Sequence, residues 1–337
     1  MKKYPLLSTA IILTLACTLG GTPESPLTIA TLQAQASAVP TSPASPTFAS
    51  TSDPQAGAPS PTIPSSNEPT GKIVYTCQVG DAGNFICLIN ADGTGFRQLT
   101  YDAVKHWYPS LSPDGASVIY SAYARDYVYE IYEMNLANGV IKQLTDSLGV
   151  LKAPEISLDG KSIVFGLGTK DDGEEIWVMD RSGANPKRIN NRGWDPSWSP
   201  DGTQILFASD SSGSIQLYTM NSDGSGVKRV TDFDALRGRS DWSPDGEWMV
   251  TYNGPAWKRE IFIFRPDFTD VRQLTPAGGN SQGPSFSPDG KWIVFTSYFD
   301  HYNDDLGCEI YIIRVDGSDL RRLTDNAYCD YQPRWSL

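Results

Sequence analysis

A four-residue turn recurs along this chain at nearly constant intervals, and this regularity limits the possible folds more than any other feature. The first copy is Ser112-Pro-Asp-Gly115, and further copies follow at intervals of 45, 42, 44 and 44 residues, at 157–160, 199–202, 243–246 and 287–290. The copy at 157–160 has Leu in place of Pro. Pro presets the backbone at the second position of a type I turn, and Gly tolerates the exit geometry. Each copy is therefore expected to join two strands.

Each repeat contains four strand-like runs. In the second full repeat these runs are 153–157, 161–167, 175–180 and 187–190, which we name the inner, second, third and outer strands. The second strands are apolar and β-branched, as burial on both faces requires. The outer strands carry Lys or Arg in each repeat, which blocks pairing with other sheet edges. The pattern predicts an all-β protein.

A single four-stranded sheet cannot bury both of its faces, so successive sheets must stack. The number of repeats predicts a six-bladed β-propeller of four-stranded antiparallel blades. The repeats begin at 71 with a second strand and end at 332–337 with an inner strand. The last blade is therefore expected to combine residues 71–100 with the C-terminal strand, so that pairing of the N- and C-terminal strands closes the ring.

Residues 1–36 have the form of an export signal. Lys2 and Lys3 precede an apolar run that is short for a membrane span. Three outcomes are open. Cys17 is the acceptor of a lipid, or cleavage follows Ala36, or the segment stays in place as an anchor.

Residues 37–70 are dominated by Pro, Ser, Thr and Ala, which predicts a disordered spacer. The domain at 71–337 is then expected outside the cytoplasm whichever way the leader is processed. We expect it in the periplasm or at the cell surface, with or without a lipid anchor.

The motifs of the repeat resemble those of a known family. The inner strand and turn read Pro, any residue, an aromatic or aliphatic residue, then Ser-Pro-Asp-Gly; the third strand reads Glu-Ile-Tyr-x-Met with Asn or Asp; the outer strand ends in Arg-x-Leu-Thr. This resembles the WD-like repeat of TolB-like six-bladed β-propellers and covers 71–337. The resemblance implies the fold, and it also implies that the α/β domain that precedes the propeller of TolB is missing here. Relatives include the periplasmic protein of the Tol-Pal envelope system, propellers attached to prolyl oligopeptidase-like enzymes, and exported proteins of unknown partner.

If Cys17 belongs to the leader, four cysteines remain, and an even number suits an oxidising compartment. Cys77 and Cys87 flank one hairpin loop, while Cys308 with Cys329 would join the long loop of the last full repeat to the connection after it. We prefer these two pairings among the three possible connectivities. The alternative is four free thiols in the core.

Strand direction alternates, so the Ser-Pro-Asp-Gly turns lie at one end of the propeller (the turn mouth). The second-to-third and outer-to-inner loops lie at the other end (the loop mouth), which varies between repeats. Aromatic residues among charged ones suit a partner face. The candidates are His106, Trp107, Tyr108, Arg125, Tyr127, Asp171, Asp172, Trp257, Lys258, Arg259, Tyr298, His301 and Tyr302.

Both histidines lie at the loop mouth, which raises the question of a metal site. Asp300, Asp304 and Asp305 lie at the same mouth as His106 and His301, and could supply carboxylate ligands. Hard cations need several oxygens converging from fixed positions, and an acidic loop is more often a solvated one. We expect no metal site and no cofactor, with calcium as the alternative.

No convincing catalytic constellation appears in the sequence, so no catalytic residue is assigned. Gly279-Asn-Ser281-Gln-Gly283 fits G-x-S-x-G, but this elbow needs a strand-to-helix turn. The Glu that opens most third strands recurs by blade, which indicates a structural role. The net charge of −12 argues against a nucleic-acid partner.

These observations favour a binding or scaffold propeller that recognises a protein, peptide or glycan at the cell envelope. We expect a monomeric propeller that meets the membrane only through its leader or lipid. The alternatives are a propeller enzyme acting on glycans, either a lyase or a hydrolase, and a detached regulatory propeller of a peptidase. The enzyme alternative needs paired carboxylates or a His-metal cluster at the channel.

Overall fold

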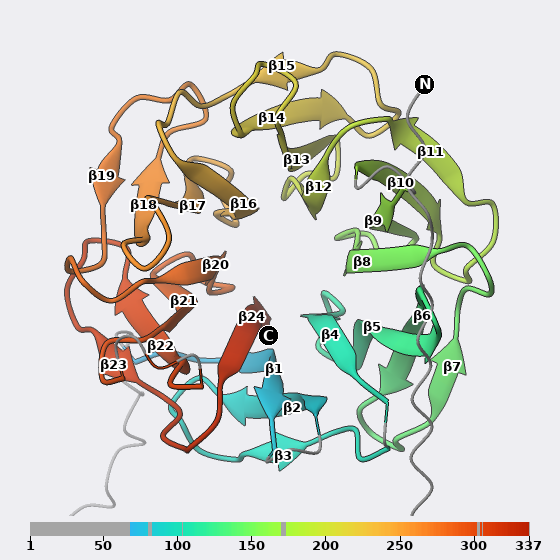
Figure 1. Cartoon of the computed structure of the whole chain (residues 1–337), viewed down its shortest axis with the longest axis horizontal. Coiled ribbons are helices and arrows are strands. Elements are labelled where there is room, and N and C mark those ends of the chain that lie inside the picture. Colours follow the sequence, from blue (N-terminus) through green and yellow to red (C-terminus); the bar gives the residue numbers. More distant parts are fainter. Residues whose placement is uncertain are drawn as a thin grey trace, which may run out of the picture. The chain divides into compact units, whose positions relative to one another are not determined.

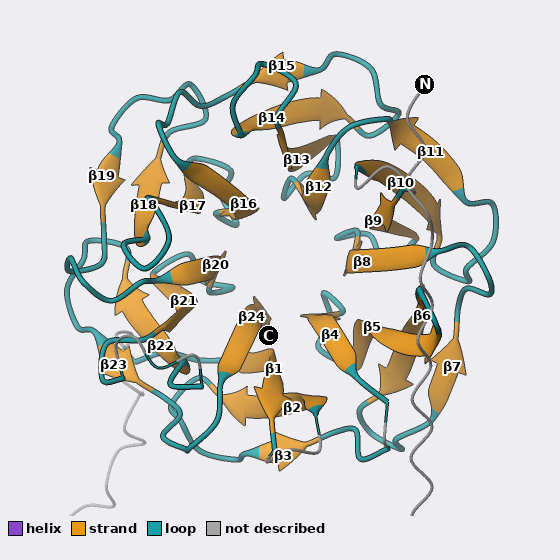
Figure 2. Cartoon of the chain, viewed as in Figure 1, coloured by secondary structure: helices purple, strands orange, loops and turns teal. Residues whose placement is uncertain are grey.

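Strands and their connecting loops make up the described part of the chain (Figure 2). The computed structural model describes residues 68–79, 83–102, 104–169, 173–301, 304 and 306–336. Within these ranges there is no helix with the length and apolar character that crossing a bilayer requires. The prediction of an all-β protein is confirmed.

The strands pair in chain order into four four-stranded sheets and one eight-stranded sheet. The first sheet contains β24 (Asp330–Ser336), β1 (Lys72–Gln78), β2 (Asn84–Asn90) and β3 (Arg97–Gln98). The eight-stranded sheet contains β4 (His106–Leu111), β5 (Ser117–Arg125), β6 (Val128–Asn135), β7 (Ile141–Gln143), β8 (Val150–Ile156), β9 (Ser162–Gly168), β10 (Glu174–Asp180) and β11 (Lys187–Asn190). The other three sheets contain β12 (Trp194–Trp198), β13 (Gln204–Ser209), β14 (Gln216–Asn221) and β15 (Lys228–Arg229); β16 (Leu236–Trp242), β17 (Met249–Asn253), β18 (Glu260–Phe264) and β19 (Arg272–Gln273); and β20 (Gln282–Phe286), β21 (Trp292–Ser297), β22 (Glu309–Arg314) and β23 (Arg321–Arg322).

The eight-stranded sheet consists of two four-stranded groups, β4–β7 and β8–β11. A single parallel pair between Tyr129 and Val150 joins them, while the other pairings are antiparallel. In Figure 1 the groups lie around a common centre, and one strand of each group lies nearest to it. These inner strands are β4, β8, β12, β16, β20 and β24.

The repeated turn has the same hydrogen bonds in successive groups. The Ser112 carbonyl accepts a bond from the Gly115 N–H (2.8 Å), and the Ser112 Oγ accepts one from the Ser117 N–H (2.9 Å). Ser112 also donates to the Asp114 carboxylate at 2.5 Å. Because both serine groups are used, the turn fixes where the inner strand ends and the second strand begins.

The recurring Glu of the third strand holds the outer strand in place. In β6 the buried Glu130 accepts hydrogen bonds from the Thr145 hydroxyl and from the Ser147 N–H, both at 2.5 Å. The Thr145 oxygen in turn accepts the Ile131 N–H at 2.9 Å. The same arrangement joins Glu260 to Thr275 and Glu309 to Thr324. These glutamates are therefore structural, as their recurrence predicts.

The apolar core lies between neighbouring groups rather than inside any one of them. Ile73, Tyr75 and Trp335 of the first sheet belong to one buried cluster with Trp292 and Val294 of β21. Burial of each large side chain contributes about 1.5–3 kcal/mol. Since both faces of each sheet are covered, the second strands need continuous apolar runs rather than alternation.

The C-terminal strand completes the sheet that the first described strand begins. β24 pairs with β1, so that Trp335 lies opposite Ile73, and the Trp335 indole N–H donates to the Thr70 carbonyl (2.8 Å). The predicted pairing of the N- and C-terminal strands is confirmed. The Gln332 side-chain oxygen accepts the N–H of Tyr108 in β4 (2.8 Å), which connects β24 to the next group.

Replacing Trp335 by Ala should lower the free energy of unfolding by about 3–5 kcal/mol, because the change removes a buried indole from the seam between the chain ends. Trp335 is 7% exposed. Denaturant unfolding followed by fluorescence measures the loss. Tyr127→Ala is the control, since Tyr127 is 88% exposed and its removal should change stability by less than about 0.5 kcal/mol. A Trp335→Ala loss as small as the control's would contradict this account of the seam.

Candidate functional site

Each inner strand carries a β-bulge, and the bulge decides which side chains face the centre. The pairing register with the second strand shifts before the turn in every group, for example between Trp107 and Ser110 in β4. At this bulge Tyr108 has a φ of 53°, in the left-handed region. Ala153, Asp195 and Gln332 have similar φ angles at the equivalent positions of β8, β12 and β24.

Two layers of side chains around the centre follow from this geometry. The loop-side layer, four residues before the turn serine or its equivalent, consists of Tyr108, Ala153, Asp195, Arg239, Gly283 and Gln332. The turn-side layer, two residues before it, consists of Ser110, Glu155, Ser197, Asp241, Ser285 and Arg334. Members of the first layer line a cavity of about 360 Å³, and members of the second line one of about 300 Å³.

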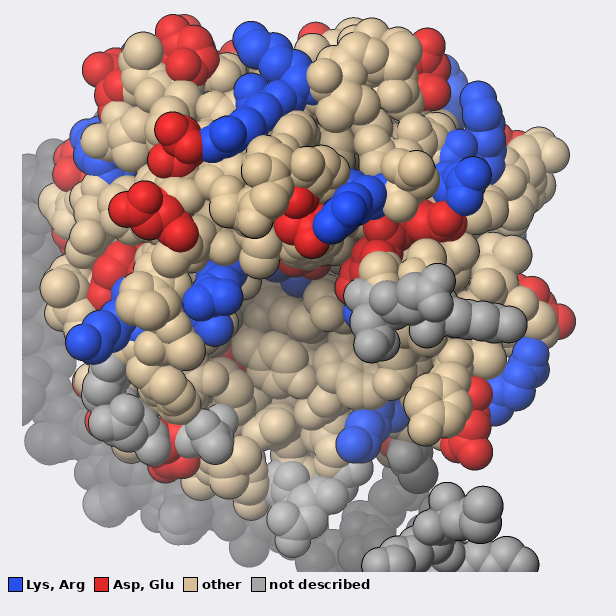
Figure 3. Space-filling model, turned by 45° about the horizontal axis from the view of Figure 1, so that its top comes forward, with Lys and Arg blue, Asp and Glu red and all other residues tan. Residues whose placement is uncertain are grey.

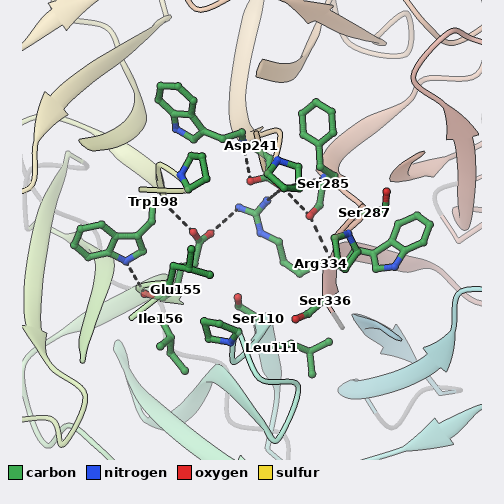
Figure 4. A pocket seen from close by; sticks show the side chains of 18 of the residues that line it. Ser110, Leu111, Glu155, Ile156, Trp198, Asp241, Ser285, Ser287, Arg334 and Ser336 are labelled. Atoms are coloured by element: carbon green, nitrogen blue, oxygen red, sulfur yellow. Dashed lines mark hydrogen bonds and ion pairs between the residues drawn. The ribbon is translucent and has the colours of Figure 1, made fainter. Parts of the chain in front are cut away.

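In the turn-side layer a buried arginine lies between two carboxylates (Figure 4). Arg334 Nη2 is 3.5 Å from Glu155 Oε2, and Arg334 Nη1 is 3.7 Å from Asp241 Oδ2. Glu155 Oε1 also accepts the Trp198 N–H (2.8 Å), and Asp241 Oδ2 accepts the Phe286 N–H (3.0 Å). Because both donors belong to the next inner strand, each carboxylate joins two neighbouring groups.

The charges of this layer largely satisfy one another. Burial raises the pKa of Glu155, while the Arg334 charge lowers it and the Asp241 charge raises it. The Ser285 hydroxyl donates to Asp241 Oδ2 at 2.8 Å. Each carboxylate thus has both a cation and hydrogen-bond donors, so the turn-side layer is best explained as a structural connection.

The loop-side cavity has walls of a different kind. Tyrosine and glutamine side chains make up much of its lining, namely Tyr108, Tyr252, Tyr298, Tyr331, Gln78, Gln282 and Gln332. Burial raises the pKa of Tyr252 and that of Tyr331 to about 12, and it also raises the pKa of Tyr108. These three hydroxyls are therefore neutral at physiological pH and can both donate and accept hydrogen bonds.

Arg239 is the buried cation of this cavity. Its side chain is 5% exposed, and its guanidinium carbon lies 5.9 Å from the centre of the Tyr108 ring. Burial, with a contribution from the charge of Arg334, lowers the pKa of Arg239 to about 10, so the group stays charged at neutral pH. Its Nε and Nη1 atoms have no hydrogen-bond partner among the described residues. Asp195 Oδ2 accepts the backbone N–H of Arg239 instead, at 3.1 Å.

Several residues predicted for the partner face meet at this cavity. Tyr108 and Tyr298 line it. The Trp257 ring lies edge-on to the Tyr298 ring with centroids 5.0 Å apart. Arg259 Nη1 donates to Oε1 of Gln282, another lining residue, at 2.7 Å.

His106 was also predicted for the partner face, and this prediction is wrong. The side chain is 1% exposed because it packs between the Phe85 and Tyr120 rings, with centroids 6.3 Å and 5.5 Å away. Its Nε2 lies 3.2 Å from the Asp102 carboxylate. Burial lowers the pKa of His106, against the opposing effect of Asp102. His106 therefore belongs to the packing between two groups and not to a binding surface.

The remaining residues of the predicted face lie apart from the cavity lining. Trp107 is half-buried against the Tyr129 ring, with centroids 5.0 Å apart. Exposed side chains are those of Arg125, Tyr127, Lys258 and His301. Outside the described residues lie Asp171, Asp172, Tyr302 and the proposed lipid acceptor Cys17.

The four cysteines form the two disulfides that the sequence favours. Cys77 pairs with Cys87 and Cys308 with Cys329, with Cα atoms 5.9 Å and 4.4 Å apart. Cys329 immediately precedes β24 and lines the loop-side cavity. The second disulfide therefore holds the start of the C-terminal strand beside β22.

The other sequence candidates are not assembled into a site. In the described part of the chain, no three His, Cys, Asp or Glu side chains are grouped to hold a metal ion. Asp300 instead accepts the Tyr311 hydroxyl (2.6 Å) and pairs with Arg322 (2.7 Å). Ser281 of the G-x-S-x-G match is fully buried, with its Oγ 3.1 Å from the Ser297 Oγ, and the strand β20 follows it in place of a helix.

Sequence reasoning missed the charged residues around the centre, Glu155, Asp241, Arg239 and Arg334. A usable signal was present in their spacing from the repeated turn. At two residues before the turn serine, Ser is the commonest residue, and Glu155 and Asp241 interrupt that pattern. Charged residues at positions that point inward in an otherwise regular repeat indicate a pairing or a ligand.

Four-stranded antiparallel sheets arranged around a channel that their inner strands line define a β-propeller. The chain belongs to the TolB beta propeller domain family, whose model matches residues 69–306. The resemblance found in the sequence motifs is thereby confirmed.

Individual relatives support the same assignment. An uncharacterised protein of Agrobacterium fabrum is 30% identical over 147 residues, which are 44% of this chain and 35% of that protein. The crystal structure of TolB from Acinetobacter baumannii matches with a TM-score of 0.69 and 26% identity, over 79% of this chain and 66% of TolB. A candidate TolB from Agrobacterium tumefaciens shares the fold, with a TM-score of 0.63 and 20% identity over 78% of this chain and 91% of the other. This chain thus spans about a third of the first relative and 66% of the Acinetobacter TolB.

A buried carboxylate at the start of β24 makes the stability of the seam depend on pH. Asp330 is 2% exposed, and it accepts a hydrogen bond from the Asn326 amide at 2.9 Å. Burial, together with the charge of Glu309, raises the pKa of Asp330 from 3.8 to about 7. The folded protein therefore binds this proton more tightly than the unfolded chain does. The resulting stabilisation is complete below about pH 4 and is lost as the pH rises through about 7.

Asp330→Asn should remove this contribution and make the protein relatively more stable at pH 8 than the wild type. At about 1.4 kcal/mol for each pH unit, the span from 3.8 to about 7 corresponds to at most about 4 kcal/mol. Urea unfolding at pH 5 and pH 8 measures the difference. Asp234→Asn, at an exposed carboxylate, is the control. If the free energy of unfolding falls by the same amount from pH 5 to pH 8 in the wild type and in Asp330→Asn, Asp330 does not titrate in this range.

Proposed function

We propose that this chain is an exported binding or scaffold module, a six-bladed propeller closed by β24 and β1, which recognises a partner at the cell envelope through its loop mouth. The observation that carries the proposal is the tyrosine- and glutamine-lined cavity at the loop side, with Trp257 and Arg259 in contact with its wall. Neutral tyrosine hydroxyls, glutamine amides and aromatic faces suit recognition of polar groups that bring apolar surface with them.

Several further observations support the proposal. The strand groups and the contact of Gln332 with Tyr108 are those expected of a closed ring. Membership of the TolB beta propeller domain family agrees with a binding role. Lys, Arg, Asp and Glu are interspersed around the central hollow in Figure 3, without the continuous basic surface that a nucleic-acid partner requires. In the described residues nothing favours the glycan-enzyme or peptidase-subunit alternatives.

A photo-crosslinking amino acid at Tyr127 should capture the partner in cells that express the full chain. Tyr127 is exposed on the loop between β5 and β6, at the loop mouth. The matched control is Leu158, which is 60% exposed in a repeated turn at the opposite mouth. Crosslinked species at Tyr127 alone are expected. Equal products from both positions, or products from Leu158 alone, would contradict the choice of face.

Export is the second part of the proposal, and Cys17 tests how it occurs. If Cys17 carries a lipid, Cys17→Ser should abolish labelling by radioactive palmitate and move the protein out of the membrane fraction. An unlabelled wild-type chain that is shorter than the full sequence would instead favour cleavage near Ala36. A full-length chain recovered in the cytoplasm would contradict export altogether.

A further inference from the structure

We propose that the loop-side cavity binds a carboxylate group through Arg239, and that this group is the C-terminal carboxylate of a partner protein or peptide. This inference rests on the proposed binding function of the loop mouth and names the chemical group that enters it. Three properties of the cavity carry it: two donor atoms of Arg239 have no partner, several nearby acceptors already receive other donors, and the cavity has limited depth.

The first property is a buried cation with two donor atoms that have no hydrogen-bond partner. Arg239 is 5% exposed and lines the cavity, yet its Nε and Nη1 have no hydrogen-bond partner among the described residues. Buried polar groups in native proteins are almost always paired, and an unpaired charged donor costs more than a neutral one. A ligand that supplies the missing acceptor removes this free-energy cost, so its binding is favoured.

The second property is that several nearby acceptor atoms already receive hydrogen bonds from other donors. Asp195 Oδ2 accepts the backbone N–H of Arg239 itself. Gln282 Oε1 accepts a bond from Arg259, and Gln332 Oε1 accepts bonds from Thr76 and Tyr108. Arg334 of the turn-side layer also has an unpartnered Nη1, but its guanidinium lies 3.5 Å from Glu155 and 3.7 Å from Asp241. With these bonds in place, Nε and Nη1 of Arg239 remain without a hydrogen-bond partner among the described residues.

The chemistry of the cavity favours a carboxylate among anions. A guanidinium presents its N–H groups as a planar fork that matches the two oxygens of a carboxylate. The charge of Arg334 lowers the pKa of Arg239, and the negative charge of Asp195 raises it and offsets part of the positive charge. A singly charged ligand suits this balance, whereas a phosphate dianion would need further cations. The tyrosine hydroxyls and glutamine amides around Arg239 can hydrogen-bond the peptide groups next to the carboxylate.

The third property is the depth of the cavity, which selects the end of a chain. The volume is about 360 Å³, and beyond it the ion pairs of Arg334 with Glu155 and Asp241 lie across the turn-side layer. An extended peptide can therefore enter from the loop mouth with its terminus first. Gly283 of the loop-side layer has no side chain. A Cβ at this position would lie 3.7 Å from Cδ of Arg239, so a larger residue would take up space in the cavity beside this arginine.

The test uses an array of peptides immobilised by their N-termini, each present once with a free C-terminal carboxylate and once as the C-terminal amide. The labelled full chain should bind a subset of the free acids about tenfold to a hundredfold more tightly than the matching amides, the range expected for loss of a charged hydrogen-bond partner. Arg239→Gln should abolish this preference, and Arg239→Lys should retain only part of it because the fork is lost. Arg97→Gln changes an exposed arginine of the outer strand β3, outside the cavity lining and the predicted partner face, and should leave the preference intact.

The outcomes separate this inference from the function on which it rests. Equal binding of acids and amides would overturn the carboxylate site while the loop-mouth crosslink from Tyr127 could still stand. Absence of binding to every peptide would overturn the peptide source. Sodium benzoate is then added in a thermal-shift titration: protection that Arg239→Gln removes would assign the site to free organic acids, and no protection would overturn the carboxylate site. Since the comparison of acid with amide needs only the wild-type chain, the test holds even if the Arg239 variants fail to fold.

Discussion

The backbone hydrogen bonds between β24 and β1 are the interaction on which the rest of this structure depends. Each four-stranded group buries its faces against its neighbours, so the groups at the two ends of the chain would each leave an apolar face in water if they did not meet. Trp335 and Ile73 lie opposite each other at this seam and share a cluster with Trp292 of β21. The position of every inner strand, and of the cavities between them, depends on that seam.

The bulges of the inner strands turn this framework into a lined channel. The bulges at positions such as Tyr108 and Gln332 insert one extra residue into the strand. Without it, the side chains of the loop-side layer would point to the other face of the strand and away from the centre. The two layers then differ in how their charges are satisfied. Arg334 forms ion pairs with Glu155 and Asp241, which join neighbouring groups, although its Nη1 has no hydrogen-bond partner. For Arg239, Nε and Nη1 have no hydrogen-bond partner among the described residues. The same repeat thus contains a structural layer and, two residues away along each inner strand, the layer for which we propose a ligand.

Much of the fold could be predicted from the sequence because it is encoded locally and repeated. The Ser-Pro-Asp-Gly turns, the apolar second strands and the charged outer strands are properties of short segments, and the pairings of Cys77 with Cys87 and of Cys308 with Cys329 follow from their places beside shared loops. The outer strand 187–190 was predicted with its bounds. By contrast, β8 begins at Val150 rather than at 153, since strand ends depend on pairing partners.

The site was harder to predict because it depends on directions and partners that a repeat pattern does not contain. His106 shares a segment with Tyr108, yet one side chain packs between Phe85 and Tyr120 while the other lines the cavity. The spacing of Arg239 from its turn could have placed it in the channel. Whether it has an acceptor depends on the hydrogen bonds that the side-chain oxygens of Asp195, Gln282 and Gln332 already accept. These residues come from three different strands.

The loop-side layer also shows how such a fold can acquire new specificities. The turns and the apolar second strands are similar from one repeat to the next, while the loop-side layer contains Tyr, Ala, Asp, Arg, Gly and Gln at equivalent places. Mutations in that layer act on one shared space, although Gln332 and Asp195 also bond the backbone of neighbouring groups. A lineage of such proteins could therefore exchange one ligand for another through single codon changes, with little loss of its capacity to fold.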